Sequence, residues 1–150
     1  MKITVMYKEQ PSILMDSHQV INAEELFNDV EDASCVDIRC ERVLDEIVYH
    51  HRDEALSNIV SKLRYGGTIS LEGVDYAILC KNVMLGKHAP LDLNTLLYAD
   101  SRQSLSYLLE MTQKLEALGL KVDTSKYSSD TDTYECPFYT IEAHRPNVEK

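Results

Sequence analysis

A helical pattern that ends at a glycine pair and continues into a strand is the feature that most constrains the fold of this chain. Apolar residues recur at the spacing of one helix face between residues 56 and 63. Gly66 and Gly67 end that pattern, and residues 68–71 then alternate with the two-residue period of a strand. A helix that leads directly into a strand predicts an α/β crossover unit. The residues on the helix face are Leu56, Ile59, Val60 and Leu63.

Strand and helix patterns alternate along most of the chain, which favours a mostly parallel α/β sheet. The last two strands are joined by a polar stretch and predict an antiparallel hairpin at one edge of the sheet. The predicted strands are 2–7, either 12–15 or 18–21, 34–38, 67–72, 120–124 and 134–143. The predicted helical segments are 23–27 (capped by Asn22), 41–48, 54–64 (capped by Asp53), 74–85, 91–98 and 104–118 (capped by Ser104 or Ser101).

The bulk properties narrow the class of protein. The 150 residues predict one domain, 1–150, with a core of its own, and no run of about 18 apolar residues is present. The net charge is −10, and residues 1–54 hold thirteen acidic side chains against five basic ones. Such a balance disfavours direct binding to nucleic acid or to an anionic membrane and suits a basic protein partner or a solvated acidic surface. The first residues become charged too early for a signal peptide, so a cytoplasmic protein is expected.

The four cysteines predict neither a metal site nor a disulfide framework. No C-x-x-C pair occurs, and no histidine stands at zinc-ligand spacing from a cysteine. Cys35, Cys80 and Cys136 lie in apolar surroundings, where a free thiol behaves as a small hydrophobic side chain. We therefore expect no bound metal.

Four segments together resemble the later part of a class I S-adenosylmethionine-dependent methyltransferase. Residues 32–47 are similar to the family's fourth strand and the turn after it, and residues 55–72 to the helix, the L-[KR]-P-G-G turn and the fifth strand, with Tyr65 in place of proline. Residues 119–122 resemble the G-F-x-V start of the sixth strand, and residues 139–146 the seventh. The stretch 91–98 is similar to small methyltransferase-like proteins of phages. The resemblance implies a Rossmann-like methyltransferase sheet.

The beginning of the chain departs from that family. The resemblance implies a Gly-rich loop after the first strand, where only glycine lets the backbone approach the cofactor. None of the five glycines precedes Gly66, and the corresponding loop would be Lys8-Glu-Gln-Pro-Ser12. Three strand-helix-strand units would need about 80 residues before the fourth strand, whereas about 33 precede Ser34. We therefore expect a truncated domain with a shortened cofactor half.

Several residues remain candidates for chemistry. For cofactor binding, the resemblance offers Asp16 at the ribose position, and Asn22 and Glu24 in a segment similar to the turn after the third strand. His50 and His51 lie where the fold places substrates, and a neutral histidine there could act as a general base; the alternative is a polar helix junction with exposed rings. The resemblance places Asp37 in the family's substrate-facing motif. The alternative is a structural role, in which its carboxylate accepts a hydrogen bond from Arg39 or Arg42.

These observations favour a non-catalytic, methyltransferase-like module that works through a homo-oligomer or another protein partner, with no cofactor. We expect the missing helices to leave an unpaired sheet edge or an uncovered apolar face. The competing hypothesis is a compact active methyltransferase that binds S-adenosylmethionine through an atypical loop or a partner subunit. A third is that the likeness is convergent and the protein binds another small molecule.

Overall fold

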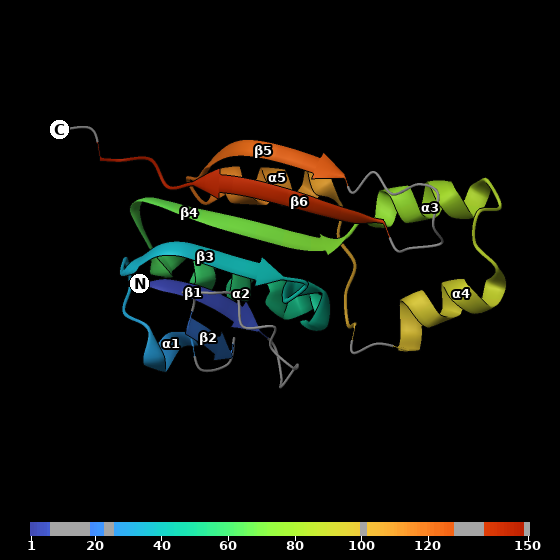
Figure 1. Ribbon diagram of the computed structural model, residues 1–150, viewed down its shortest axis with the longest axis horizontal. Coiled ribbons are helices and arrows are strands. Elements are labelled where there is room, and N and C mark those ends of the chain that lie inside the picture. Colours follow the sequence, from blue (N-terminus) through green and yellow to red (C-terminus); the bar gives the residue numbers. More distant parts are fainter. Residues whose placement is uncertain (7–18, 23–25, 100–101, 128–136, 149–150) are drawn as a thin grey trace.

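The computed structural model describes residues 1–6, 19–22, 26–99, 102–127 and 137–148, and within these ranges six strands form one sheet (Figure 1). The strands are β1 (Lys2–Met6), β2 (Gln19–Asn22), β3 (Cys35–Glu41), β4 (Leu63–Val74), β5 (Lys121–Tyr127) and β6 (Phe138–His144), in the order β2-β1-β3-β4-β6-β5. Strands β2, β1, β3 and β4 are parallel, whereas β6 is antiparallel to both β4 and β5. The mostly parallel sheet and the antiparallel pair at one edge confirm the prediction.

The helical segments connect these strands. They are α1 (Leu26–Asp29), the 3₁₀ turn η1 (Leu44–Glu46), α2 (Tyr49–Lys62), α3 (Tyr76–Met84), α4 (Pro90–Asn94), the π-helical turn η2 (Thr95–Ala99) and α5 (Leu108–Ala117). None of the described helices is both long enough and apolar enough to cross a membrane.

Several predicted boundaries were wrong, among them those of three helical segments. The helix expected over 41–48 is replaced by the end of β3 and η1, because β3 continues to Glu41 and the chain then turns at Arg42 with φ of 59°. Helix α2 begins at Tyr49, so Asp53 lies inside the helix and does not cap it. Helix α5 begins at Leu108, and the Ser104 hydroxyl donates instead to the carbonyl of Leu44 at 3.0 Å.

The sheet has one apolar face and one polar face. Helices α2 and α5 lie behind the sheet in Figure 1, and their apolar side chains form one core cluster with the inward-facing strand residues. Alternate strand residues point to the opposite face, on which no described helix packs. The core side chains contributed by the central strands are Ile3, Val5, Ile38, Cys40, Ile69, Leu71, Tyr139, Ile141 and Ala143. The opposite face, here called the polar face, carries Lys2, Thr4, Asp37, Arg39, Glu41, Thr68, Ser70, Glu72, Thr140, Glu142 and His144.

The polar face corrects the expectation of an uncovered apolar face. Parallel strands that carry helices on both sides are apolar throughout, because both of their faces are buried. Here charged and hydroxyl side chains alternate with buried ones in β3, β4 and β6. The strands themselves are therefore patterned for a sheet with helices on one side.

Residues 76–99 form a separate feature, here called the arm, made of α3, α4 and η2. In Figure 1 the arm projects from the end of the sheet at which β4 finishes. Leu79 is the one buried residue of α3, and no residue of α4 is buried.

Candidate functional site

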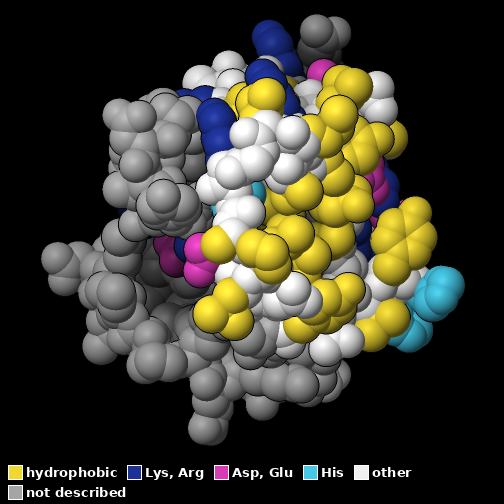
Figure 2. Space-filling model, turned by 90° about the vertical axis from the view of Figure 1, so that its right-hand side faces the viewer, with side chains coloured by type: hydrophobic (Ala, Val, Ile, Leu, Met, Phe, Trp, Pro, Cys, Tyr) yellow, Lys and Arg dark blue, Asp and Glu magenta, His cyan; other side chains and the backbone are white. Residues whose placement is uncertain are grey.

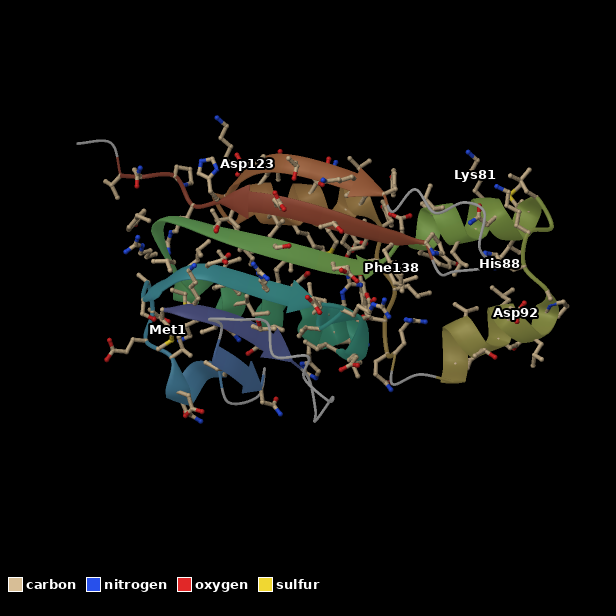
Figure 3. The ribbon with its side chains drawn as sticks, viewed as in Figure 1. Met1, Lys81, His88, Asp92, Asp123 and Phe138 are labelled. Carbon is tan, nitrogen blue, oxygen red and sulfur yellow. The ribbon has the colours of Figure 1, made fainter. Side chains whose placement is uncertain are left out.

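The carboxyl ends of the parallel strands are where folds of this type bind ligands, in the crevice where the strand order reverses. That reversal lies at β1, which has β2 on one side and β3 on the other. Beyond the end of β3, the Arg42 N–H donates to the carbonyl of Glu72 at 2.8 Å. The Arg42 guanidinium carbon lies 4.0 Å from the centre of the Phe138 ring, where β6 begins beside the end of β4 (Figure 3). Arg42 is therefore held against the protein by its own neighbours.

Asp45, in η1, is a buried carboxyl at this edge. Its Oδ2 accepts from the Val74 N–H at 2.9 Å, and its backbone carbonyl accepts from the N–H groups of Gln103 and Ser104 at 2.7 and 3.1 Å. Burial raises the pKa of Asp45 to about 6, although the bond from Val74 and nearby arginines oppose that shift. Asp45 thus joins η1 to the end of β4 and to the segment before α5.

Asp75 follows β4 and is fully buried. Its Oδ1 accepts from the Ile78 N–H and its Oδ2 from the Leu108 N–H, both at 2.9 Å. The first N–H groups of a helix have no partner within the helix, so a carboxylate in this position stabilises the helix start. One side chain therefore caps both α3 and α5, although their first residues are 32 positions apart in the sequence.

Two further groups of buried polar contacts lie near the carboxyl edge. Arg52 of α2 donates through Nη1 to the carbonyl of Leu105 at 2.6 Å, and its Nη2 lies 3.8 Å from Oε1 of Glu110. The hydroxyl oxygens of Ser106 and Tyr139 are 2.7 Å apart, and both side chains are buried. Asp45, Asp75, Ser106 and Tyr139 thus bind the protein's own backbone or one another, which is a structural role.

Asp37 lies away from the carboxyl edge. It is the third residue of β3, not at the strand's end as the predicted strand 34–38 implied, and it points to the polar face. Its Oδ1 accepts from the Thr68 hydroxyl at 3.1 Å, and its Oδ2 lies 3.9 Å from Nε of Arg39. Asp37 lines an open hollow of about 390 Å³ on this face together with Glu41 and with Asp123, which is labelled in Figure 3. Within the described ranges, no three metal-binding side chains come together.

His50 and His51 occupy the first turn of α2, and both are exposed. The His50 ring stands edge-on to Tyr49, with ring centroids 6.2 Å apart. Neither histidine lines the hollow that contains Asp37. The structure does not gather the three catalytic candidates around one point.

The cofactor-binding candidates are placed only in part. Asn22 is the last residue of β2, paired in register with Met6 at the carboxyl ends of the two strands. It therefore ends a strand and does not begin α1, which starts at Leu26. Asp16, Glu24 and the loop 8–12 lie outside the described residues.

Sequence reasoning missed the buried polar residues that organise the carboxyl edge. Asp75 carried a usable signal, because an aspartate directly after a strand and before a helical pattern is a typical N-cap. Asp45 and Arg52 carried none, since their partners lie 29 and 53 residues away along the chain.

Comparisons at the sequence level give no matching family model and no matching curated protein. Solved structures do match. A chain from the Haloferax volcanii complex that contains the Trm112 methyltransferase activator aligns with a TM-score of 0.62 and 14% identity over 91% of this chain and 65% of its own. An S-adenosylmethionine-dependent methyltransferase from Archaeoglobus fulgidus aligns with a TM-score of 0.60 and 14% identity. That alignment covers 94% of this chain and 74% of the other. The magnesium protoporphyrin IX methyltransferase of Synechocystis PCC 6803, solved with bound S-adenosylhomocysteine, aligns with a TM-score of 0.58 and 13% identity. That alignment covers 89% of this chain and 53% of the other.

This chain thus spans between about half and three quarters of the length of those structures. At these identities the likeness concerns the fold, and it agrees with the strand order and the antiparallel β5–β6 pair. The chain has the Rossmann-like fold of class I S-adenosylmethionine-dependent methyltransferases.

Proposed function

We propose that this protein is a non-catalytic interaction or assembly module with a methyltransferase fold, and that it has lost the ability to bind S-adenosylmethionine. The polar face carries this proposal. Helices pack on a sheet through apolar contacts, and β3, β4 and β6 present charged and hydroxyl side chains on that side. On these three strands, helices that would brace a cofactor loop from that side have no apolar surface to pack on.

The sequence of the first loop supports the same conclusion. The backbone after β1 must come close to a bound cofactor, and a side chain at the point of approach prevents this. Residues 7–18 connect β1 to β2 and include no glycine. In addition, Pro11 lacks the backbone N–H that could bind a ligand. The buried carboxylates of Asp45 and Asp75 at the carboxyl edge are already engaged, because both accept from backbone N–H groups.

The polar face is also suited to binding a protein. It carries the carboxylates Asp37, Glu41 and Glu142 beside Arg39 around the hollow described above. A mixed-charge surface with an excess of acid selects partners by charge complementarity and accelerates encounter with basic surfaces.

Thermal unfolding with S-adenosylhomocysteine tests the proposal. A ligand with a dissociation constant of about 10 μM would stabilise the fold by about 2.7 kcal/mol at 1 mM. For a chain of this size, that stabilisation would raise the Tm by about 5–10 °C. We expect no change in Tm and no heat in calorimetric titration at 1 mM S-adenosylmethionine or S-adenosylhomocysteine. Micromolar binding of either compound would overturn the proposal, and an active class I methyltransferase serves as the positive control.

The second candidate is a compact methyltransferase that takes its cofactor loop from a partner subunit. The observation favouring it is that one structural neighbour comes from a complex containing a methyltransferase activator. Under this alternative, Asp37 would face the substrate, His50 or His51 would supply a general base, and Asn22 would lie nearest the cofactor. Cofactor binding that appears only after a partner protein is added would support this function over the first.

A further inference from the structure

We propose that the arm, residues 76–99, is a homodimerisation surface that packs against the arm of a second copy of this chain. The proposal does not depend on whether the cofactor is bound. Figure 2 views the molecule from the arm side and shows a broad apolar surface in yellow, with few charged groups at its centre.

The arm is too short and too exposed to be stable by itself. Helix α3 has nine residues and α4 has five, whereas isolated helices below about 12–15 residues are marginal in water. Most helical stability comes from packing an apolar face, yet Leu79 is the one buried residue in these two helices. The arm therefore needs a surface to cover its apolar side chains.

The exposed area is of the size that a dimer buries. Met84, Leu91 and Tyr98 are 87%, 77% and 78% exposed, although all three are large apolar or aromatic residues. From these exposed fractions, the six large apolar residues of the arm together expose roughly 700 Å², close to the 800 Å² that each partner contributes to a standard interface. A patch of this size exceeds what monomeric proteins usually expose. The six residues are Tyr76, Val83, Met84, Leu85, Leu91 and Tyr98.

The distribution of charge makes the arm the part of the surface at which a second copy is repelled least. The arm has two lysines, Lys81 and Lys87, and one aspartate, Asp92, so its net charge is +1 while the whole chain carries −10. Figure 3 shows Lys81 and Asp92 on the arm, away from the strands. Two copies with a net charge of −10 repel each other over most of their surface. Repulsion is smaller at the arm, where three of 24 residues are charged, and apolar burial there favours association.

A two-fold arrangement satisfies both copies at once. In an isologous contact the same patch is used twice, so each exposed side chain of one arm covers its counterpart region on the other. The closed pair leaves no apolar arm free for further growth. We therefore expect a dimer and no larger assembly.

Sedimentation or light scattering of the full chain between about 1 and 100 μM tests the proposal, a range that covers typical weak to moderate association. The expected mass at the upper concentration is twice the 17.1 kDa of the chain. The variants Met84→Glu and Leu91→Glu should each return the mass to that of one chain, because a buried unpaired carboxylate opposes association. Both positions are highly exposed in the single chain, so we expect the circular dichroism spectrum of the fold to persist.

Leu109→Glu is the matched control. Leu109 is 60% exposed on α5, outside the arm, and the same substitution there should leave the dimer intact. A single-chain mass at 100 μM would overturn the proposal, since the arm would then serve another protein or a substrate. A dimer that survives both arm variants would also overturn it, because the interface would lie elsewhere. Neither result bears on cofactor binding, which the thermal shift measures separately.

Discussion

Removal of the Asp75 carboxylate should uncouple the starts of α3 and α5. The carboxylate accepts from the N–H groups of Ile78 and Leu108, both at 2.9 Å, in a fully buried position. In Asp75→Ala both donors lose their partner, and each unsatisfied buried donor costs about 1–3 kcal/mol. The expected loss in the free energy of unfolding is therefore about 2–6 kcal/mol, a large share of the roughly 5–15 kcal/mol typical of a domain.

Urea denaturation at fixed protein concentration measures this loss, since dimer formation would make the stability depend on concentration. The midpoint should fall while the slope m stays unchanged, because the substitution alters stability and not the surface exposed on unfolding. Amide hydrogen exchange should show lost protection at Ile78 and at Leu108 together. Asp92→Ala is the control, because Asp92 is an exposed aspartate in the first turn of α4 and should cost about 0.5 kcal/mol or less. If Asp75→Ala costs no more than this control, the double-cap reasoning is refuted.

Two other substitutions test the packing and the electrostatics of the same edge. In Gly73→Ala the new Cβ would come 2.5 Å from Oη and 2.7 Å from Cζ of Tyr139, so we expect a loss of about 1–3 kcal/mol in thermal unfolding. Adding Tyr139→Phe should not rescue it, whereas Tyr139→Leu should; rescue by phenylalanine would contradict the clash with the ring. Because burial raises the pKa of Asp45 to about 6, its ionisation costs stability as the pH rises from about 4 to 6. The gain of Asp45→Asn over the wild type should therefore grow across that range to on the order of 2 kcal/mol and level off above it, and a gain independent of pH would contradict this.

The overall fold follows from local patterns that this sequence displays clearly. The apolar stripe at 56–63 and the alternation at 68–71 were enough to predict α2 and β4 as neighbours in an α/β unit. The final two strands were predicted as an antiparallel pair because a polar stretch joins them, and the structure pairs β5 with β6 in this way. These signals depend on residues close together in the chain, so one sequence reveals them.

The details of the carboxyl edge depend on distant contacts and could not be predicted in the same way. Strand β3 continues to Glu41 through Asp37 and Arg39, polar residues that read as the end of a strand unless one face of the sheet is known to be polar. Ser104 looked like a helix cap, yet its hydroxyl binds Leu44, sixty residues earlier, and the cap comes from Asp75. Sequence periodicity indicates which face is buried, but it does not show which polar group will meet a given N–H.

The shared carboxylate of Asp75 has a mechanical consequence. The first turns of α3 and α5 donate to the two oxygens of one carboxylate. A tilt of α3 would therefore break the hydrogen bond from Ile78 or from Leu108 to Asp75, or it would displace α5 from β5 and β6. The base of the arm is thus held at a set angle to the sheet. Two chains joined by their arms would then keep a constant spacing and a constant orientation between their sheets.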